Sequence, residues 1–169
     1  MSGTVTNVVL AGLGGQGVIK ASDILADAAL RAGRDVKKAE IHGMSQRGGS
    51  VTSDVRFGRT PADRVLSPMV PRGEADFLVV LAPSEVEVNR AALRSGGLLL
   101  APDMIPEAEL PNKRSLNVAL LGALSYHLDL PADALLAAVE AALPEKLHAV
   151  NAAAFELGRK VAAAQGTIS

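Results

Sequence analysis

The sequence predicts an α/β protein with a Rossmann-like layered fold, a mostly parallel sheet and a helical C-terminal third. Short apolar runs typical of buried strands alternate with segments of helical spacing over roughly the first 100 residues. A glycine-rich turn follows the first of these runs, as it does where a strand leads into a helix. Alanine-rich segments of helical spacing make up most of the rest. Because 169 residues suit one domain, we expect a single domain over residues 1–169.

The first half of the chain contains the alternation on which the fold class depends. Residues 5–11 form a valine-rich run, typical of a central strand that is buried on both faces. Residues 15–32 repeat apolar side chains at helical spacing, and a glycine follows where that helix would end. Residues 36–41 predict a second strand. Over residues 51–57, apolar and polar side chains alternate, which predicts a strand with one face in water.

The second half contains two further predicted strands and most of the helices. Three prolines and two glycines predict a long loop over residues 58–73. Residues 76–82 predict a strand, residues 83–94 a helix, and residues 98–100 a short buried strand. Alanine-rich helices pack closely, either on the sheet or on another subunit. Three of them are expected, at residues 116–128, 132–142 and 145–164.

The composition excludes several classes of function. The chain has no cysteine, so it has no disulfide and no cysteine ligand for zinc or an iron–sulfur cluster. Any iron–sulfur centre involved must therefore lie on another chain. A net charge of -1 and 2% aromatic residues argue against nucleic-acid binding. No apolar run reaches the roughly 18 residues of a membrane helix and no signal peptide is recognisable, so we expect a cytoplasmic protein with no membrane contact.

The turn after the first strand has the pattern G-x-G-x-x-G with one additional glycine. Such a turn lets backbone N–H groups and the positive end of a helix approach an anionic group. Glu40, near the end of the second strand, would complete a dinucleotide site by bonding a ribose. The alternative is that the glycines serve only the close packing of helix on strand. The candidate ligand-binding residues in this turn are Gly12, Gly14, Gly15, Gln16 and Gly17.

A second glycine-rich loop follows the predicted second strand, and we expect it at the same sheet edge as the first turn. Within it, Arg47 could grip a phosphate or carboxylate, and His42 could titrate near neutral pH. The alternative is a loop that satisfies its own backbone, with Met44 filling a gap in the core. No catalytic triad, carboxylate pair or metal-spaced histidine cluster is recognisable in the sequence. As a docking surface, the loop comprises His42, Gly43, Met44, Ser45, Gln46, Arg47, Gly48 and Gly49.

The two glycine-rich segments, residues 12–17 and 42–51, together resemble the gamma-type subunits of 2-oxoacid:ferredoxin oxidoreductases. More narrowly, they resemble the beta subunit of indolepyruvate:ferredoxin oxidoreductases. The second segment is the more specific of the two. The resemblance covers nearly the whole chain, through Arg56-Phe57, Ser67-Pro68, Pro71, Gly73-Glu74-Ala75-Asp76, Glu85, Asn117, Leu120-Leu121-Gly122-Ala123, Asn151, Ala154-Phe155-Glu156 and Gly158.

The resemblance implies that the whole chain is one gamma-type catalytic domain of the pyruvate/ketoisovalerate oxidoreductase kind inside a larger enzyme. Such enzymes oxidatively decarboxylate a 2-oxoacid to an acyl-CoA and pass electrons to ferredoxin. Companion subunits would carry thiamine diphosphate, Mg²⁺ and iron–sulfur clusters, with coenzyme A as co-substrate. This chain would bind no cofactor firmly, hold no catalytic residue and be inactive alone. Residues 12–17 and Arg47 would contact coenzyme A, and residues 42–49 would dock a companion subunit.

Two other functions remain open from the residues alone. A self-contained NAD(P)- or FAD-binding Rossmann protein would rest on the glycine turn and Glu40, although the sequence shows no group of residues suited to hydride transfer. A nucleotide-sensing interaction module would use the alanine-rich helices as its partner surface. Calorimetry with NAD, NADP, FAD and coenzyme A distinguishes the first of these from an oxidoreductase subunit.

Overall fold

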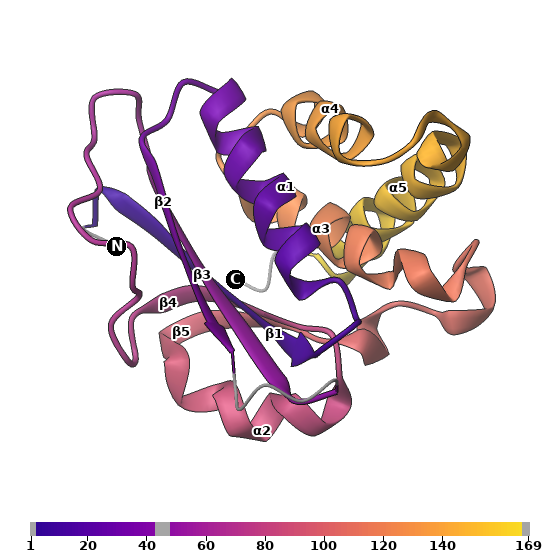
Figure 1. Cartoon of the computed structure of the whole chain (residues 1–169), viewed down its shortest axis with the longest axis horizontal. Helices are drawn as coiled ribbons and strands as arrows, with labels where there is room; N and C mark the ends of the chain where they lie inside the picture. Colours follow the sequence, from indigo (N-terminus) through magenta and orange to yellow (C-terminus); the bar gives the residue numbers. More distant parts are fainter. Residues whose placement is uncertain (1–2, 43–47, 167–169) are drawn as a thin grey trace.

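The computed structural model describes residues 3–42 and 48–166, and its framework is a five-stranded sheet in the order β2-β3-β1-β4-β5 (Figure 1). The central strand is β1, the valine-rich run that the sequence predicts to be buried on both faces. Every residue from Thr6 to Gly12 in that strand is buried. The strands are β1 (Val5–Leu13), β2 (Val36–His42), β3 (Ser50–Gly58), β4 (Ala75–Val80) and β5 (Leu93–Leu100).

Four of the five strands point in one direction, which confirms the prediction of a mostly parallel sheet. The strand β1 pairs in parallel with β4, and β4 pairs in parallel with β5. The exception is β3, which runs antiparallel to both β1 and β2 and therefore separates them. The first strand–helix–strand unit thus encloses a third strand, because β2 and β3 form an antiparallel pair that returns to β1.

A layer of helices covers one face of the sheet, and Figure 1 shows α1, α3, α4 and α5 together on that side. The larger hydrophobic core lies between this layer and the sheet. Residues 117–125 of α3 are all buried, as expected for a helix enclosed by sheet and helices. The predicted helices of the C-terminal third are confirmed within a few residues. Those helices are α3 (Leu116–His127), α4 (Ala132–Ala142) and α5 (His148–Gln165), and α1 (Val18–Arg31) precedes them in the first half of the chain.

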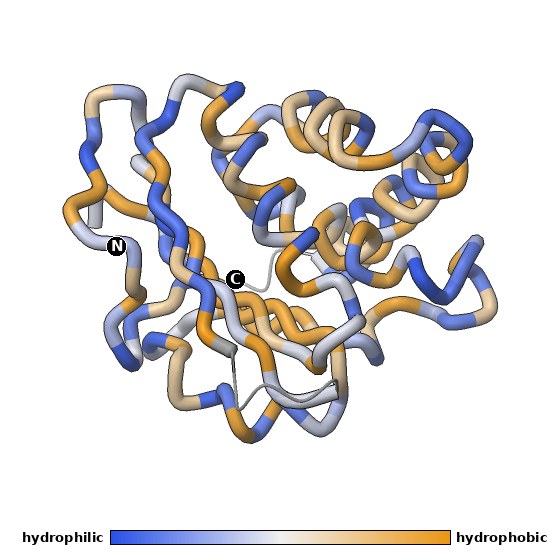
Figure 2. Tube along the Cα trace, in the orientation of Figure 1, coloured by the Kyte–Doolittle hydropathy of each residue, from blue (hydrophilic) through white to orange (hydrophobic). Residues whose placement is uncertain are grey.

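The second face of the sheet has a thinner cover, made by α2 (Val86–Asn89) and the segment before β4. Figure 2 shows hydrophobic residues concentrated along the central strands, between the two covers. The single helix predicted over residues 83–94 is wrong. Two 3-10 turns flank the four-residue α2, and β5 already begins at Leu93. The strands β4 and β5 approach closely here, since a Cβ on Gly97 in β5 would lie 2.9 Å from the carbonyl oxygen of Ala75 in β4.

The polar face predicted for β3 is only partly in water, because Thr52 and Arg56 are half-buried and Asp54 is buried. Asp54 is buried because the loop after β3 crosses it, and the Val70 backbone N–H donates to its Oδ2 at 2.8 Å. Arg56 donates from Nη1 to the Ser67 carbonyl oxygen at 2.8 Å in the same loop. Alternation therefore identified the two faces of the strand but not the loop that covers one of them. Among the described helices, none is long and apolar enough to cross a membrane.

Candidate functional site

The glycine-rich turn connects the end of β1 to the start of α1 and depends on glycine at defined positions. Gly15 and Gly17 have φ angles of 90° and 85°, in the left-handed region that favours glycine. Gly17 directly precedes α1, and its carbonyl oxygen accepts from the Ala21 N–H at 2.9 Å. A Cβ on Gly12 would lie 2.8 Å from Cγ2 of Val18, so this glycine lets the helix lie close to the strand.

Gln16 holds the turn closed with its side chain. Its Oε1 accepts from the Leu13 backbone N–H at 2.7 Å. Its Nε2 donates to the Leu81 carbonyl oxygen at 3.4 Å, just past the end of β4. The amide thus links the ends of the two parallel central strands. Both polar ends of this side chain are occupied, so the turn can offer a ligand its backbone N–H groups rather than this amide.

The turn and the second glycine-rich loop meet at the same edge of the sheet, which confirms that expectation for the described part of the loop. The Gly14 N–H donates to the Gly49 carbonyl oxygen at 2.9 Å. A Cβ on Gly14 would lie 3.1 Å from the Gly48 backbone nitrogen. Predictions for Gly43, Met44, Ser45, Gln46 and Arg47, and for the side chain of His42, fall outside the described residues.

The base of that loop is fixed by a buried carboxylate. Glu85 is 6% exposed, and its Oε1 accepts from the Ser50 hydroxyl at 3.0 Å. Asn89 donates from Nδ2 to the Glu85 carbonyl oxygen at 2.8 Å, which holds the start of α2 in place. Because Ser50 begins β3, this contact ties the end of the docking loop to the second face of the sheet.

A cleft of about 580 Å³ opens beside the glycine turn, at the N-terminus of α1. Three cationic residues line it, and no acidic residue does so among those the structure places there. Lys20 lies in the first turn of α1, whereas Lys113 and Arg114 belong to a 3-10 turn that directly precedes α3. Its described lining is Gly15, Gln16, Gly17, Lys20, Leu81, Lys113, Arg114, Leu116 and Asn117.

The three cationic side chains differ in the hydrogen bonds and ion pairs that they already make with neighbouring groups. Lys20 Nζ donates to the Ala142 carbonyl oxygen at 3.4 Å. Lys113 Nζ lies 3.1 Å from Glu107 Oε1, and both side chains are largely exposed. The Arg114 guanidinium has no hydrogen-bond acceptor within residues 3–42 and 48–166. With the positive end of α1, these groups make the cleft suited to a phosphate or carboxylate.

Sequence reasoning missed Lys113 and Arg114, although it identified the turn they face. They lie almost a hundred residues from the turn, and only the packing of α3 beside α1 brings them to it. Asn117 makes that contact, since its Nδ2 donates to the Gly17 carbonyl oxygen at 3.4 Å. An adjacent pair of cations directly before a predicted helix was the available signal.

Glu40 does not join this site. The strand β3 lies between β1 and β2, so Glu40 stands two strands away from the glycine turn. Its carboxylate pairs with Lys38 on its own strand. A ribose-binding acid of a dinucleotide site would instead stand at the end of the strand next to β1. In the described part of the chain there is also no cluster of His, Asp and Glu that could hold a metal ion.

Comparison with known proteins identifies the family. The family described as pyruvate ferredoxin/flavodoxin oxidoreductase matches residues 7–111. The indolepyruvate oxidoreductase subunit IorB of Thermococcus kodakarensis is 33% identical, over 92% of this chain and 95% of that protein. IorB of Methanothermobacter thermautotrophicus is 31% identical, over 93% of this chain and 97% of that one. The pyruvate/ketoisovalerate oxidoreductases common subunit gamma of T. kodakarensis is 37% identical over 53% of this chain and 47% of its own length.

Solved structures agree with the sequence comparison. The gamma subunit of a keto/oxoacid ferredoxin oxidoreductase from Geobacter sulfurreducens superposes with a TM-score of 0.77 at 26% identity, covering 94% of this chain and 99% of that one. The 2-oxoglutarate:ferredoxin oxidoreductase of Magnetococcus marinus shares the fold, with a TM-score of 0.81 at 24% identity over 96% of this chain and 32% of that one. These matches favour a subunit over a self-contained NAD(P) or FAD protein. The chain belongs to the pyruvate ferredoxin/flavodoxin oxidoreductase family, as a gamma-type subunit of a 2-oxoacid:ferredoxin oxidoreductase.

Proposed function

We propose that this chain serves an enzyme that oxidatively decarboxylates an indolepyruvate-like 2-oxoacid to an acyl-CoA and reduces ferredoxin. The supporting observation is similarity to two IorB subunits over 95% and 97% of their lengths. The chain has no cysteine, so iron–sulfur clusters would be held by a companion subunit. Thiamine diphosphate and Mg²⁺ would be held there too. This chain would have no turnover of its own.

Reconstitution tests the proposal. The chain is expressed alone and together with its thiamine-diphosphate-binding companion, and 2-oxoacid-dependent reduction of ferredoxin is measured with coenzyme A present. We expect no activity from the chain alone and activity from the complex, with indolepyruvate preferred over pyruvate, 2-ketoisovalerate and 2-oxoglutarate. Turnover by the isolated chain, or a companion that is fully active without it, contradicts the subunit role. Preference for an aliphatic 2-oxoacid contradicts only the substrate assignment.

Within that enzyme, the cleft beside the glycine turn would hold phosphate groups of coenzyme A. Coenzyme A carries a pyrophosphate and a 3′-phosphate, which suits several cations placed around a helix N-terminus. Arg114 is the strongest candidate, because its guanidinium has no acceptor among the described residues. The backbone of Gly12, Gly14, Gly15, Gln16 and Gly17 and the side chain of Arg47 would complete the contact.

Titration of the reconstituted complex with coenzyme A tests this contact. Arg114→Ala should weaken binding about tenfold, as loss of one charge-assisted phosphate contact does. The same variant should bind dephospho-coenzyme A with a smaller loss if Arg114 faces the 3′-phosphate. Arg90→Ala is the matched control, since Arg90 is exposed and pairs with Glu87 on α2. Unchanged affinity in Arg114→Ala contradicts the assignment, and tight binding of NAD or FAD would favour a dinucleotide site instead.

The docking loop, residues 42–49, would contact the companion subunit next to this cleft. Its described end touches the glycine turn through the hydrogen bond between Gly14 and Gly49. A companion seated on the loop would therefore also border the cleft and shield a bound phosphate from water.

The whole chain, residues 1–169, would act as one gamma-type domain, because both hydrophobic clusters are built on the same sheet.

A further inference from the structure

The two edge strands of the sheet differ in how they are protected against further pairing. At one edge, β2 carries Lys37, Lys38 and Glu40, and Lys38 forms ion pairs with both Asp23 and Glu40. Charged side chains along an edge strand are a common means of preventing another strand from adding to the sheet. The charged side chains of β2 therefore disfavour the addition of another strand at this edge.

The opposite edge lacks this protection. The last three residues of β5 are Leu98, Leu99 and Leu100, and no charged residue lies among them. Within the described ranges, β5 pairs only with β4. Near the start of the strand, Arg94 Nη1 donates a hydrogen bond to the Ser95 carbonyl oxygen at 2.9 Å. The outward backbone groups of residues 98–100 have no partner from any other described element.

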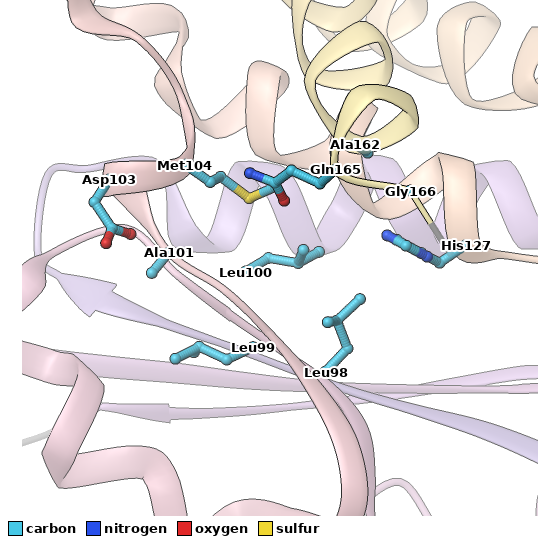
Figure 3. A pocket seen from close by; sticks show the side chains of 10 residues that line it. All are labelled: Leu98, Leu99, Leu100, Ala101, Asp103, Met104, His127, Ala162, Gln165 and Gly166. Carbon is cyan, nitrogen blue, oxygen red and sulfur yellow. The ribbon is translucent and has the colours of Figure 1, made fainter. Parts of the chain in front are cut away.

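A mostly apolar groove of about 260 Å³ runs beside this edge, as Figure 3 shows, and its polar lining consists of Asp103, His127 and Gln165. Leu98 and Leu100 pack on the helix side of the sheet with the larger core, whereas Leu99 packs on the opposite side. The end of α5 forms the other wall, through Ala162 and Gln165. A strand added beside β5 would direct every second side chain into this groove.

We propose that an extended apolar segment of the companion subunit adds to β5 as a sixth strand and places alternate side chains in the groove. The inference rests on the proposed function for the existence of that companion. A second copy of this chain fits less well, because a ladder of three residues buries far less than the roughly 1,200 Å² of a stable interface. A companion that is also held at the docking loop needs this edge only as one of several contacts.

Hydrogen exchange tests the pairing directly. Amide exchange of residues 98–100 is followed in the isolated chain and in the complex with the companion. We expect amides on the outward edge to exchange at least about tenfold more slowly in the complex, since a new ladder bond must open before exchange. Equal exchange rates in the two samples would overturn the proposal. Protection of these amides in the isolated chain, lost in a variant ending at Gly166, would assign the edge to the chain's own C-terminal residues and also overturn it.

A charged variant supplies the second readout. Leu98→Lys gives β5 the kind of protection that β2 has, and should weaken the complex about tenfold or more. Leu66→Lys is the matched control, because Leu66 is 92% exposed and lies in the loop before β4. Thermal unfolding of each isolated variant shows whether the chain still folds. If Leu98→Lys does not fold, the exchange comparison of the wild-type chain still decides the question.

The outcomes separate this inference from the proposed function. If no companion copurifies with the wild-type chain, the subunit role itself fails. If the companion binds both lysine variants equally well and residues 98–100 stay unprotected, only the sixth strand is contradicted. A wild-type chain that doubles its mass alone, and loses this in Leu98→Lys, would make a second copy the occupant and overturn the proposal.

Discussion

Among single residues, Gly17 carries two separate constraints. Its φ of 85° disfavours any side chain, and a Cβ there would lie 2.6 Å from Asn117 Nδ2. Asn117 is buried and also accepts from the Val118 N–H through Oδ1 at 2.9 Å, so it cannot move without losing a hydrogen bond. The contact between the glycine turn and α3 therefore requires a residue without a side chain at position 17.

Alanine at two glycines of the turn separates the two constraints. Gly15→Ala adds backbone strain alone, since its φ is 90° and nothing lies within 4 Å of the new Cβ. It should cost about 1 to 2 kcal/mol of unfolding free energy. Gly17→Ala adds the displacement of Asn117 and should cost roughly 1 to 3 kcal/mol more. Urea unfolding of both variants measures the difference, and equal losses would contradict a role for Asn117.

Asp54 gives the folded state a dependence on pH. Burial raises the pKa of its carboxyl, and the Val70 N–H and Arg56 offset part of this effect. The folded state therefore keeps the proton at pH values where the unfolded chain, with a pKa near 3.8, has lost it. Stability from this group is present below the unfolded pKa and is lost as pH rises through the folded pKa.

Asp54→Asn should remove this loss, because the amide stays neutral and its oxygen can still accept from Val70. The unfolding free energy of the variant minus that of the wild-type chain should rise as pH increases above 3.8, the pKa in the unfolded chain, and level off once the pH exceeds the raised pKa of the folded state. Denaturant unfolding at several pH values measures it. Asp103→Asn, at an exposed position, makes the same charge change and should show no comparable rise. If the difference in unfolding free energy for Asp54→Asn does not change with pH, burial does not raise the pKa of this carboxyl.

Among the elements, α3 and α5 cross at two glycines that have no room for a side chain. A Cβ on Gly158 would overlap the Ala119 carbonyl oxygen, and one on Gly122 would overlap that of Phe155. Both obstacles are backbone, which cannot rotate away as a side chain can. The contact between the two helices holds the C-terminal third on the sheet, and α3 in turn carries Asn117 and follows Arg114.

Gly158→Ala should therefore destabilise the protein, although alanine is the better helix former. We expect a loss of about 3 kcal/mol or more, because the helices must separate to admit the methyl group. Ala153→Gly, at an exposed position of the same helix, should cost only about 1 kcal/mol from helix propensity. Chemical unfolding compares the two. A stabilised Gly158→Ala variant would mean that the helices do not pack at this glycine.

The same elements explain which parts of the fold the sequence could predict. Alternation identified the strand at residues 51–57, but period two carries no information about neighbours, so the insertion of β3 between β1 and β2 was not predictable. That insertion also removed Glu40 from the site. The predicted helix over residues 83–94 extended into β5, because it is pairing with β4, not local preference, that makes Leu93 and Arg94 part of a strand. The glycine turn was recognisable locally, whereas Arg114 reaches it only through the fold.

For the whole molecule, the order of strands and helices places the basic cleft and the apolar groove in separate regions of the surface. The helix layer completes the larger hydrophobic core on one face, and its helices α1 and α5 also border the cleft and the groove. The glycine turn, the described end of the docking loop and the basic cleft lie together at the end of the parallel strands, where ligands bind in open α/β sheets. The apolar edge at β5 lies beyond them. Under the proposed function, a gamma-type subunit built in this way would contribute binding surfaces, and the redox chemistry would fall to its companions.

The single-domain proposal for residues 1–169 has a spectroscopic test. Adjacent residues of β1 point into different clusters, Val8 and Leu10 into the larger and Val9 and Ala11 into the smaller. Neither cluster can lose its strand without exposing the other, so the chain should unfold in one cooperative transition. The chain has one tyrosine, Tyr126 at the end of α3, and no tryptophan. Tyrosine fluorescence, which reports on the C-terminal third, should therefore have the same urea midpoint as far-ultraviolet circular dichroism. Separate midpoints would mean that the helical third unfolds by itself, and would contradict a single domain.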